Sequence, residues 1–91
     1  MASTSAQRVF SEIGRIAQLD VPLRERRAEA AKRINQFKAD LAVAHVQPRE
    51  AERLKENLRR TLQRGATQHD LTAEENSVYA EALDVLVGQG R

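Results

Sequence analysis

The two histidines are the residues of this sequence whose side chains best suit acid–base or metal chemistry. His45 stands near the end of a predicted helix, where an imidazolium interacts favourably with the helix dipole. His69 precedes Asp70, but metal sites usually need three or four protein ligands, and only Glu74 and Glu75 lie near in sequence. The spacing therefore favours helix capping for His45, and we expect neither a bound metal nor a cofactor.

Other catalytic groupings are not visible by spacing. The chain has no cysteine, and its hydroxyl residues cluster in the first residues and at predicted helix caps, away from any base that a third group could orient. The four glycines do not form a phosphate-binding loop. Glu74 and Glu75 fall on the first turn of a predicted helix, where the dipole stabilises negative charge. We expect no enzymatic activity and no small-molecule substrate.

The stretch REAERLKENLRRTLQRG at 49–65 contains the sharpest indication of a partner. On a helix its apolar stripe is centred on Leu58, and Glu56 lies on the opposite side, close to a stripe of arginines. Such a stripe can be a solvated face, can dock on duplex DNA, or can meet an acidic surface, either on another protein or on the last predicted helix. The candidate residues for a charged partner are Arg49, Arg53, Arg60 and Arg64, which fall within about 60° of one another.

Aromatic residues argue against a single-stranded nucleic acid as the partner. Phe10 and Phe37 lie on predicted core stripes, and Tyr79 lies on an apolar face, so no exposed ring is left for bases to stack on. The break at 45–48 also lies between helices that are too long for a helix-turn-helix motif. Nucleic acid therefore ranks below protein as a partner.

Four helices must position these residues. Helix-forming residues dominate, and no strand-like alternation stands out. Pro22 and Pro48 mark restarts of the helical pattern, and Gly65 is expected to end the third helix in a left-handed conformation. We predict an all-α protein, a single domain over 1–91 with frayed tails at 1–4 and 88–91. The predicted helices cover about 5–19, 22–45, 48–64 and 73–87, the second and third forming a long antiparallel hairpin on which the others pack.

The fourth predicted helix differs from the others in the width of its apolar face. Thr72 and Glu75 have the spacing of a capping box at its start. Its apolar residues cover more than half of the circumference, wider than one hairpin face can cover. This face is either the centre of the core or, in part, an interface with a second copy or a partner. Candidate interface residues are Val78, Tyr79 and Leu86.

Charge is distributed unevenly along the chain. Residues 70–90 carry five acidic and no basic residues, whereas 1–69 carry 14 basic and eight acidic ones. This asymmetry indicates either an interaction surface or an intramolecular match between a basic body and an acidic last helix. The N-terminus lacks a secretory signal pattern, and no apolar run suits a membrane span.

These observations together predict a cytoplasmic binding protein. We expect a small adaptor, regulator or inhibitor of a larger protein that acts through protein–protein contacts as a homodimer. The alternative is a DNA-binding regulator that uses the arginine stripe.

Overall fold

The computed structural model describes residues 5–88 and confirms the predicted all-α fold. The expected fraying at 1–4 and 89–91 concerns residues outside this range. Within the described part, no helix is both long and apolar enough to cross a membrane. The four helices are α1 (Ala6–Ala17), α2 (Leu23–Val43), α3 (Pro48–Thr67) and α4 (Ala73–Leu86).

Local sequence signals account for most helix boundaries. Ser5 caps α1 by accepting a hydrogen bond from the backbone N–H of Arg8 at 3.3 Å. Pro48 occupies the first position of α3, where its missing N–H costs no intrahelical bond. The predicted capping box of α4 is present, with the Glu75 N–H on Thr72 Oγ1 at 3.1 Å and the Thr72 N–H on Glu75 Oε1 at 2.8 Å.

The predicted end of α3 is wrong. Gly65 does not terminate the helix in a left-handed conformation; it lies inside α3, which continues to Thr67, and it is buried. Among the described glycines a positive φ occurs at Gly88, after the end of α4. The reason for a glycine at position 65 is therefore packing and not backbone conformation.

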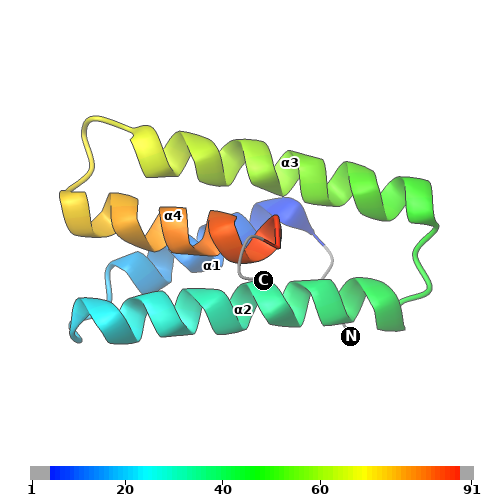
Figure 1. Ribbon diagram of the computed structural model, residues 1–91, viewed down its shortest axis with the longest axis horizontal. Helices are drawn as coiled ribbons and strands as arrows, with labels where there is room; N and C mark the ends of the chain where they lie inside the picture. Colours follow the sequence, from blue (N-terminus) through cyan, green and yellow to red (C-terminus); the bar gives the residue numbers. More distant parts are fainter. Residues whose placement is uncertain (1–4, 89–91) are drawn as a thin grey trace.

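The helices form a bundle in which α1 and α4 lie between the two long helices (Figure 1). α2 and α3 run antiparallel, as expected for consecutive helices joined by a short loop. They touch each other only slightly, because each packs against both α1 and α4. α4 makes its most extensive contacts with α2 and α3, and it also contacts α1. This central position explains why α4 needs so wide an apolar face.

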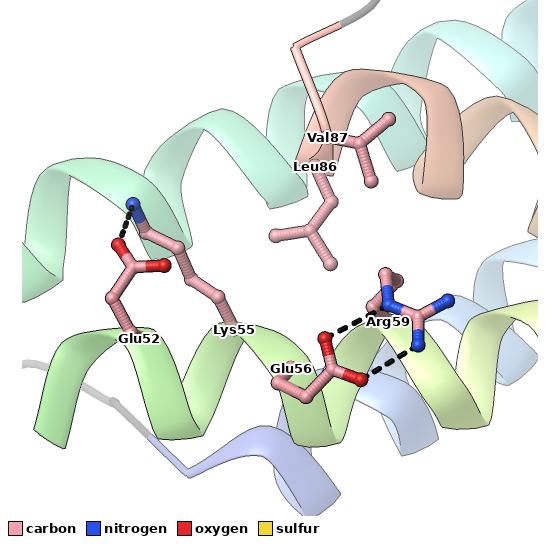
Figure 2. Close-up of a pocket in the computed structure, with 6 residues that line it drawn as sticks. All are labelled: Glu52, Lys55, Glu56, Arg59, Leu86 and Val87. Carbon is pink, nitrogen blue, oxygen red and sulfur yellow. Dashed lines mark hydrogen bonds and ion pairs between the residues drawn. The ribbon is translucent and has the colours of Figure 1, made fainter. Parts of the chain in front are cut away.

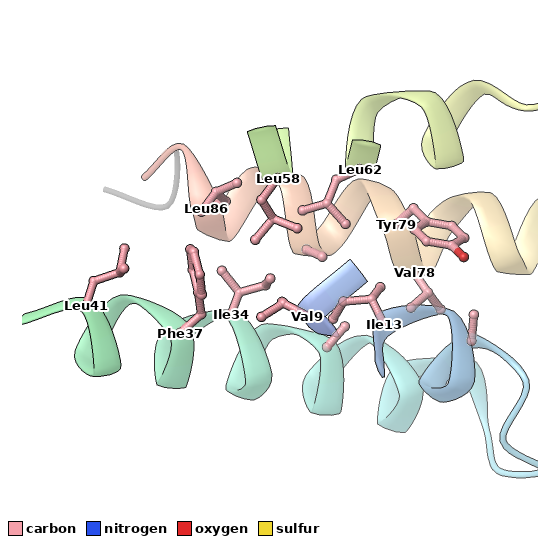
Figure 3. Packing of buried hydrophobic residues seen from close by; sticks show 13 residues of the cluster. Val9, Ile13, Ile34, Phe37, Leu41, Leu58, Leu62, Val78, Tyr79 and Leu86 are labelled. Carbon is pink, nitrogen blue, oxygen red and sulfur yellow. The ribbon is translucent and has the colours of Figure 1, made fainter. Parts of the chain in front are cut away.

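One apolar core runs through the bundle between the four helices (Figure 3). Phe37 of α2 is its largest fully buried side chain. Burial of each such side chain contributes roughly 1.5–3 kcal/mol relative to exposure. The other core residues are Val9, Ile13, Ala17, Ala30, Ile34, Leu41, Leu58, Leu62, Val78, Tyr79, Ala82 and Leu86.

Tyr79 is packed between two glycines on different helices. A Cβ at Gly65 would lie 2.7 Å from Cγ and Cδ1 of the Tyr79 ring, and a Cβ at Gly14 would lie 2.9 Å from the Tyr79 hydroxyl. The ring also stacks on Phe10 with a centroid separation of 5.5 Å. Glycine at 14 and at 65 thus lets α1 and α3 approach the aromatic ring of α4.

Ion pairs from α2 connect this helix to the acidic α4 and to α1. Arg26 pairs with Glu74, and Arg27 Nη2 lies 3.0 Å from Glu81 Oε1. Arg33 of α2 pairs with Glu12 of α1. The uneven charge distribution is therefore used, at least in part, for an intramolecular match between basic α2 and acidic α4.

Candidate functional site

The arginine stripe lies on the face of α3 that points away from the core. Leu58 and Leu62, on the opposite face, are fully buried against the other helices. This arrangement follows from the helical period, because an amphipathic helix that buries one stripe leaves the opposite one in solvent. Arg49, Arg53, Arg60 and Arg64 are all exposed, as the sequence indicated. From Arg49 to Arg64 the stripe extends about 22 Å along the helix.

Two of these arginines have partners within α3. Arg53 is bound to Glu50 through both Nε and Nη2, with the shortest contact at 2.6 Å. Hydrogen bonding to Glu50 raises the pKa of Arg53. Arg60 donates to Asn57 Oδ1 at 3.2 Å and lies 3.8 Å from Glu56. Both side chains remain about two-thirds exposed, so these pairs are screened by water and salt.

The two end members of the stripe differ from the two inner ones. Among residues 5–88, Arg49 and Arg64 have no hydrogen bond or ion pair with a carboxylate. Their guanidinium groups therefore offer their full set of donors to a ligand.

A groove on one flank of α3 is electrically balanced (Figure 2). It has a volume of about 440 Å³ and lies between α3 and the end of α4, beside Leu86 and Val87. Its charged residues pair within the groove: Lys55 with Glu52 at 3.7 Å, and Arg59 with Glu56 at 2.6 Å. The bond from Arg59 lowers the pKa of Glu56 and leaves little charge to attract a ligand.

A second groove, of about 460 Å³, lies on the other flank of α3, against the first turn of α1. Arg60 and Arg64 of the stripe line it, together with the half-buried Leu54 and Ala6. No acidic residue of the described chain lines it. Two of the four predicted arginines thus lie in one groove with apolar side chains. Arg49 and Arg53 lie outside this groove.

The candidate apolar interface on α4 is packed inside the chain. Val78 is fully buried, and Tyr79 and Leu86 are 8% and 6% exposed. Their burial agrees with the interpretation that the wide apolar face of α4 forms the centre of the core. Large apolar side chains that are exposed among the described residues lie elsewhere: Leu19, Val21, Val43 and Val87.

The histidines lie apart from each other and from any metal-binding cluster in the described chain. His45 follows the C-cap of α2 and has a positive φ of 57°, a left-handed conformation in which histidine is enriched among non-glycine residues. His69 is exposed in the loop between α3 and α4. Within residues 5–88, no three His, Asp or Glu residues are grouped so that they could hold an ion.

The arginines of α2 that pair across helices were not singled out as contact residues from the sequence. Arg26 contacts the Val21 and Ala17 carbonyls as well as Glu74, and Arg27 contacts Glu81. Arg33 pairs with Glu12. A signal was present, because five acidic residues fall in 70–90 and the helices before it are basic. Sequence alone did not show which basic helix the acidic one would meet.

No protein-family model, curated protein or solved structure matches this chain.

Proposed function

We propose that this chain is a small helical binding protein that recognises an acidic surface of a larger protein with the arginine stripe of α3. The observation that carries the proposal is the placement of four arginines on the one long face of α3 that no other described helix covers. The adaptor, regulator or inhibitor role follows from such binding. Chemistry on a small substrate has no comparable support in the described part of the chain.

Glutamates on the same face favour a protein partner over duplex DNA. Glu50 holds Arg53, and Glu56 lies close to Arg60, so a phosphate backbone laid along the stripe would meet carboxylates at two positions. A protein surface can place its own acids at the arginines and a donor at each glutamate. The stripe has net positive charge, and its acidic interruptions add selectivity.

Self-association through the stripe is disfavoured, because two copies would bring eight arginines together. The expected homodimer stays a prediction that must use another surface, since Val78, Tyr79 and Leu86 pack within the chain. Dimer formation and binding of an acidic partner are therefore separable properties.

The test compares a fluorescently labelled polyglutamate peptide, long enough to span the stripe, with a labelled DNA duplex. Fluorescence anisotropy follows the binding of each probe at increasing salt. We expect the polyglutamate peptide to bind at low salt and dissociate as salt rises, because surface charge contacts are screened. The double variant Arg53→Glu with Arg60→Glu should abolish this binding.

A control variant carries the same change in net charge at sites away from the stripe. Arg15→Glu with Arg24→Glu reverses two exposed arginines on α1 and α2, and it should retain most of the binding. Equal loss in both double variants would mean that net charge, and not the stripe, determines binding. Stripe-dependent retention of the DNA duplex without the peptide would favour the DNA-binding alternative. Unchanged binding in every variant would identify the stripe as a solvated face.

A further inference from the structure

The two flanks of α3 provide grooves of similar volume, one electrically balanced and the other positively charged. The groove towards α4 contains two bases and two acids, which are paired with each other. The groove towards α1 contains Arg60 and Arg64 and no acid of the described chain. On the α1 side a ligand therefore meets positive charge that is offset only at Arg60, by Glu56 at 3.8 Å, whereas on the α4 side the charges are paired within the groove.

The backbone of α1 adds to this positive potential. The first turn of α1 forms one wall of the groove and carries no acidic residue, so the positive end of its helix dipole is not offset there. Arg60 is oriented by its hydrogen bond to Asn57, which also lines the groove. Arg64 has no carboxylate partner among residues 5–88.

Apolar atoms form the other part of the surface. Leu54 and Ala6 are half-buried, and each packs against the edge of the core while facing the groove. A free phosphate would leave this apolar surface in contact with water. An acidic peptide can instead cover it with an apolar side chain and place carboxylates on the two guanidiniums.

We propose that the groove between α1 and α3 is the binding site for a short acidic segment of the partner. In this segment an apolar side chain is flanked by glutamates or aspartates. This inference rests on the proposed function and specifies which part of the stripe recognises sequence. Arg60 and Arg64 bind the carboxylates, and Leu54 with Ala6 receives the apolar side chain. Arg49 and Arg53 then contribute attraction along the rest of α3.

The acidic helix α4 of a second copy fits this groove poorly. On α4, the acidic helix, Glu74 and Glu81 are already paired with Arg26 and Arg27 of α2. Presenting them to another copy would break contacts that hold the bundle together. The proposed occupant is therefore an acidic segment of a different protein and not α4 of a second copy.

The probe is a labelled peptide with one leucine between pairs of glutamates, too short to reach Arg49 from the groove. Its counterpart carries glutamine in place of glutamate. We expect the acidic peptide to bind and the glutamine peptide to bind at least about tenfold more weakly, because the charge-assisted contacts are lost. In isotope-labelled protein, amide signals of Ala6, Leu54 and Thr61 should shift on binding, and those near Arg49 should not.

Ala6→Glu places a carboxylate of the chain itself in the groove. An acid at the first position of α1 is favourable to the helix, so folding is retained, and the affinity for the acidic peptide should fall about tenfold or more. Ala6→Gln adds the same bulk at this half-buried position without the charge, so the affinity of Ala6→Glu should lie about tenfold or more below that of Ala6→Gln. Arg49→Glu should leave the short peptide unaffected and weaken the polyglutamate probe.

The outcomes separate the two proposals. Stripe-dependent binding of polyglutamate without binding of the short peptide overturns the groove and leaves the proposed function standing. Failure of both probes overturns both. Equal affinities of Ala6→Glu and Ala6→Gln for the short peptide would also mean that the peptide binds outside this groove.

Discussion

Replacing each of the two glycines that contact Tyr79 by alanine tests the packing of the core. In a helix interior, alanine is more favourable than glycine by about 1 kcal/mol, so both changes would stabilise the protein if space allowed. At Gly65 the new Cβ would lie 2.7 Å from two ring carbons, and at Gly14 it would lie 2.9 Å from the hydroxyl oxygen alone. The two substitutions therefore probe different parts of one side chain.

The expected changes in the free energy of unfolding depend on whether the atoms next to the new Cβ can move. The ring is held by its stacking on Phe10 and is 8% exposed, so Gly65→Ala forces a shift of packed atoms. Such overpacking costs about 1–3 kcal/mol, and after the helix gain of about 1 kcal/mol we expect a net loss of stability of up to about 2 kcal/mol. For Gly14→Ala the cost of the close contact with the Tyr79 hydroxyl and the gain in helix propensity should nearly cancel. In a Tyr79→Phe background the obstructing hydroxyl is gone, and Gly14→Ala should then stabilise by about 1 kcal/mol.

Urea unfolding followed by circular dichroism measures these free energies, and thermal melting provides a second reading. For a domain of this size, 1 kcal/mol corresponds to a shift of roughly 4–8 °C in Tm. Tyr79→Phe should rescue Gly14→Ala and should not rescue Gly65→Ala, because the phenylalanine ring still occupies the space at position 65. A Gly65→Ala protein more stable than the parent, or rescue of both variants, would refute the packing described for Tyr79.

Three further predictions concern pH, capping and assembly. Burial, and to a lesser degree Glu75, raises the pKa of Tyr79, so its contribution to stability is complete below the unfolded pKa of about 10 and is lost as pH rises through the folded value. Absorbance of this single tyrosine in a pH titration checks the shift, and Tyr79→Phe should lack the corresponding alkaline loss of stability. Thr72→Ala should lower the free energy of unfolding by about 1 kcal/mol in urea titrations, with Thr72→Ser near the parent. Light scattering at micromolar concentration should give about twice the chain mass of 10.2 kDa if the expected homodimer forms, and a value near 10.2 kDa would contradict it.

Local sequence signals predicted the helices well, and packing accounts for the errors. Proline at 48 and the capping box at Thr72 act within one turn, so their effect can be read from neighbouring residues. Gly65 was misassigned as a helix end because its purpose depends on Tyr79, which is distant in sequence. The order of the helices around the core likewise depends on contacts that periodicity does not encode.

Only the part of the candidate site that depends on a single helix could be predicted from the sequence. Exposure of Arg49, Arg53, Arg60 and Arg64 follows from the period of one helix, and the structure confirms it. The groove beside Arg60 and Arg64 requires the first turn of α1 to lie against α3, which no pattern in either segment indicates. The interface expected on α4 depended on how much of its apolar face other helices cover, which also required the tertiary arrangement.

The place of α4 between the two longest helices has a consequence for how the native state is reached. Since α2 and α3 scarcely touch, the first three helices alone leave exposed to water the parts of α2 and α3 that pack against α4. α4 must therefore pack against the other three helices before they become stable. Folding should therefore be all-or-none, and a nascent chain would stay open until α4 has emerged from the ribosome.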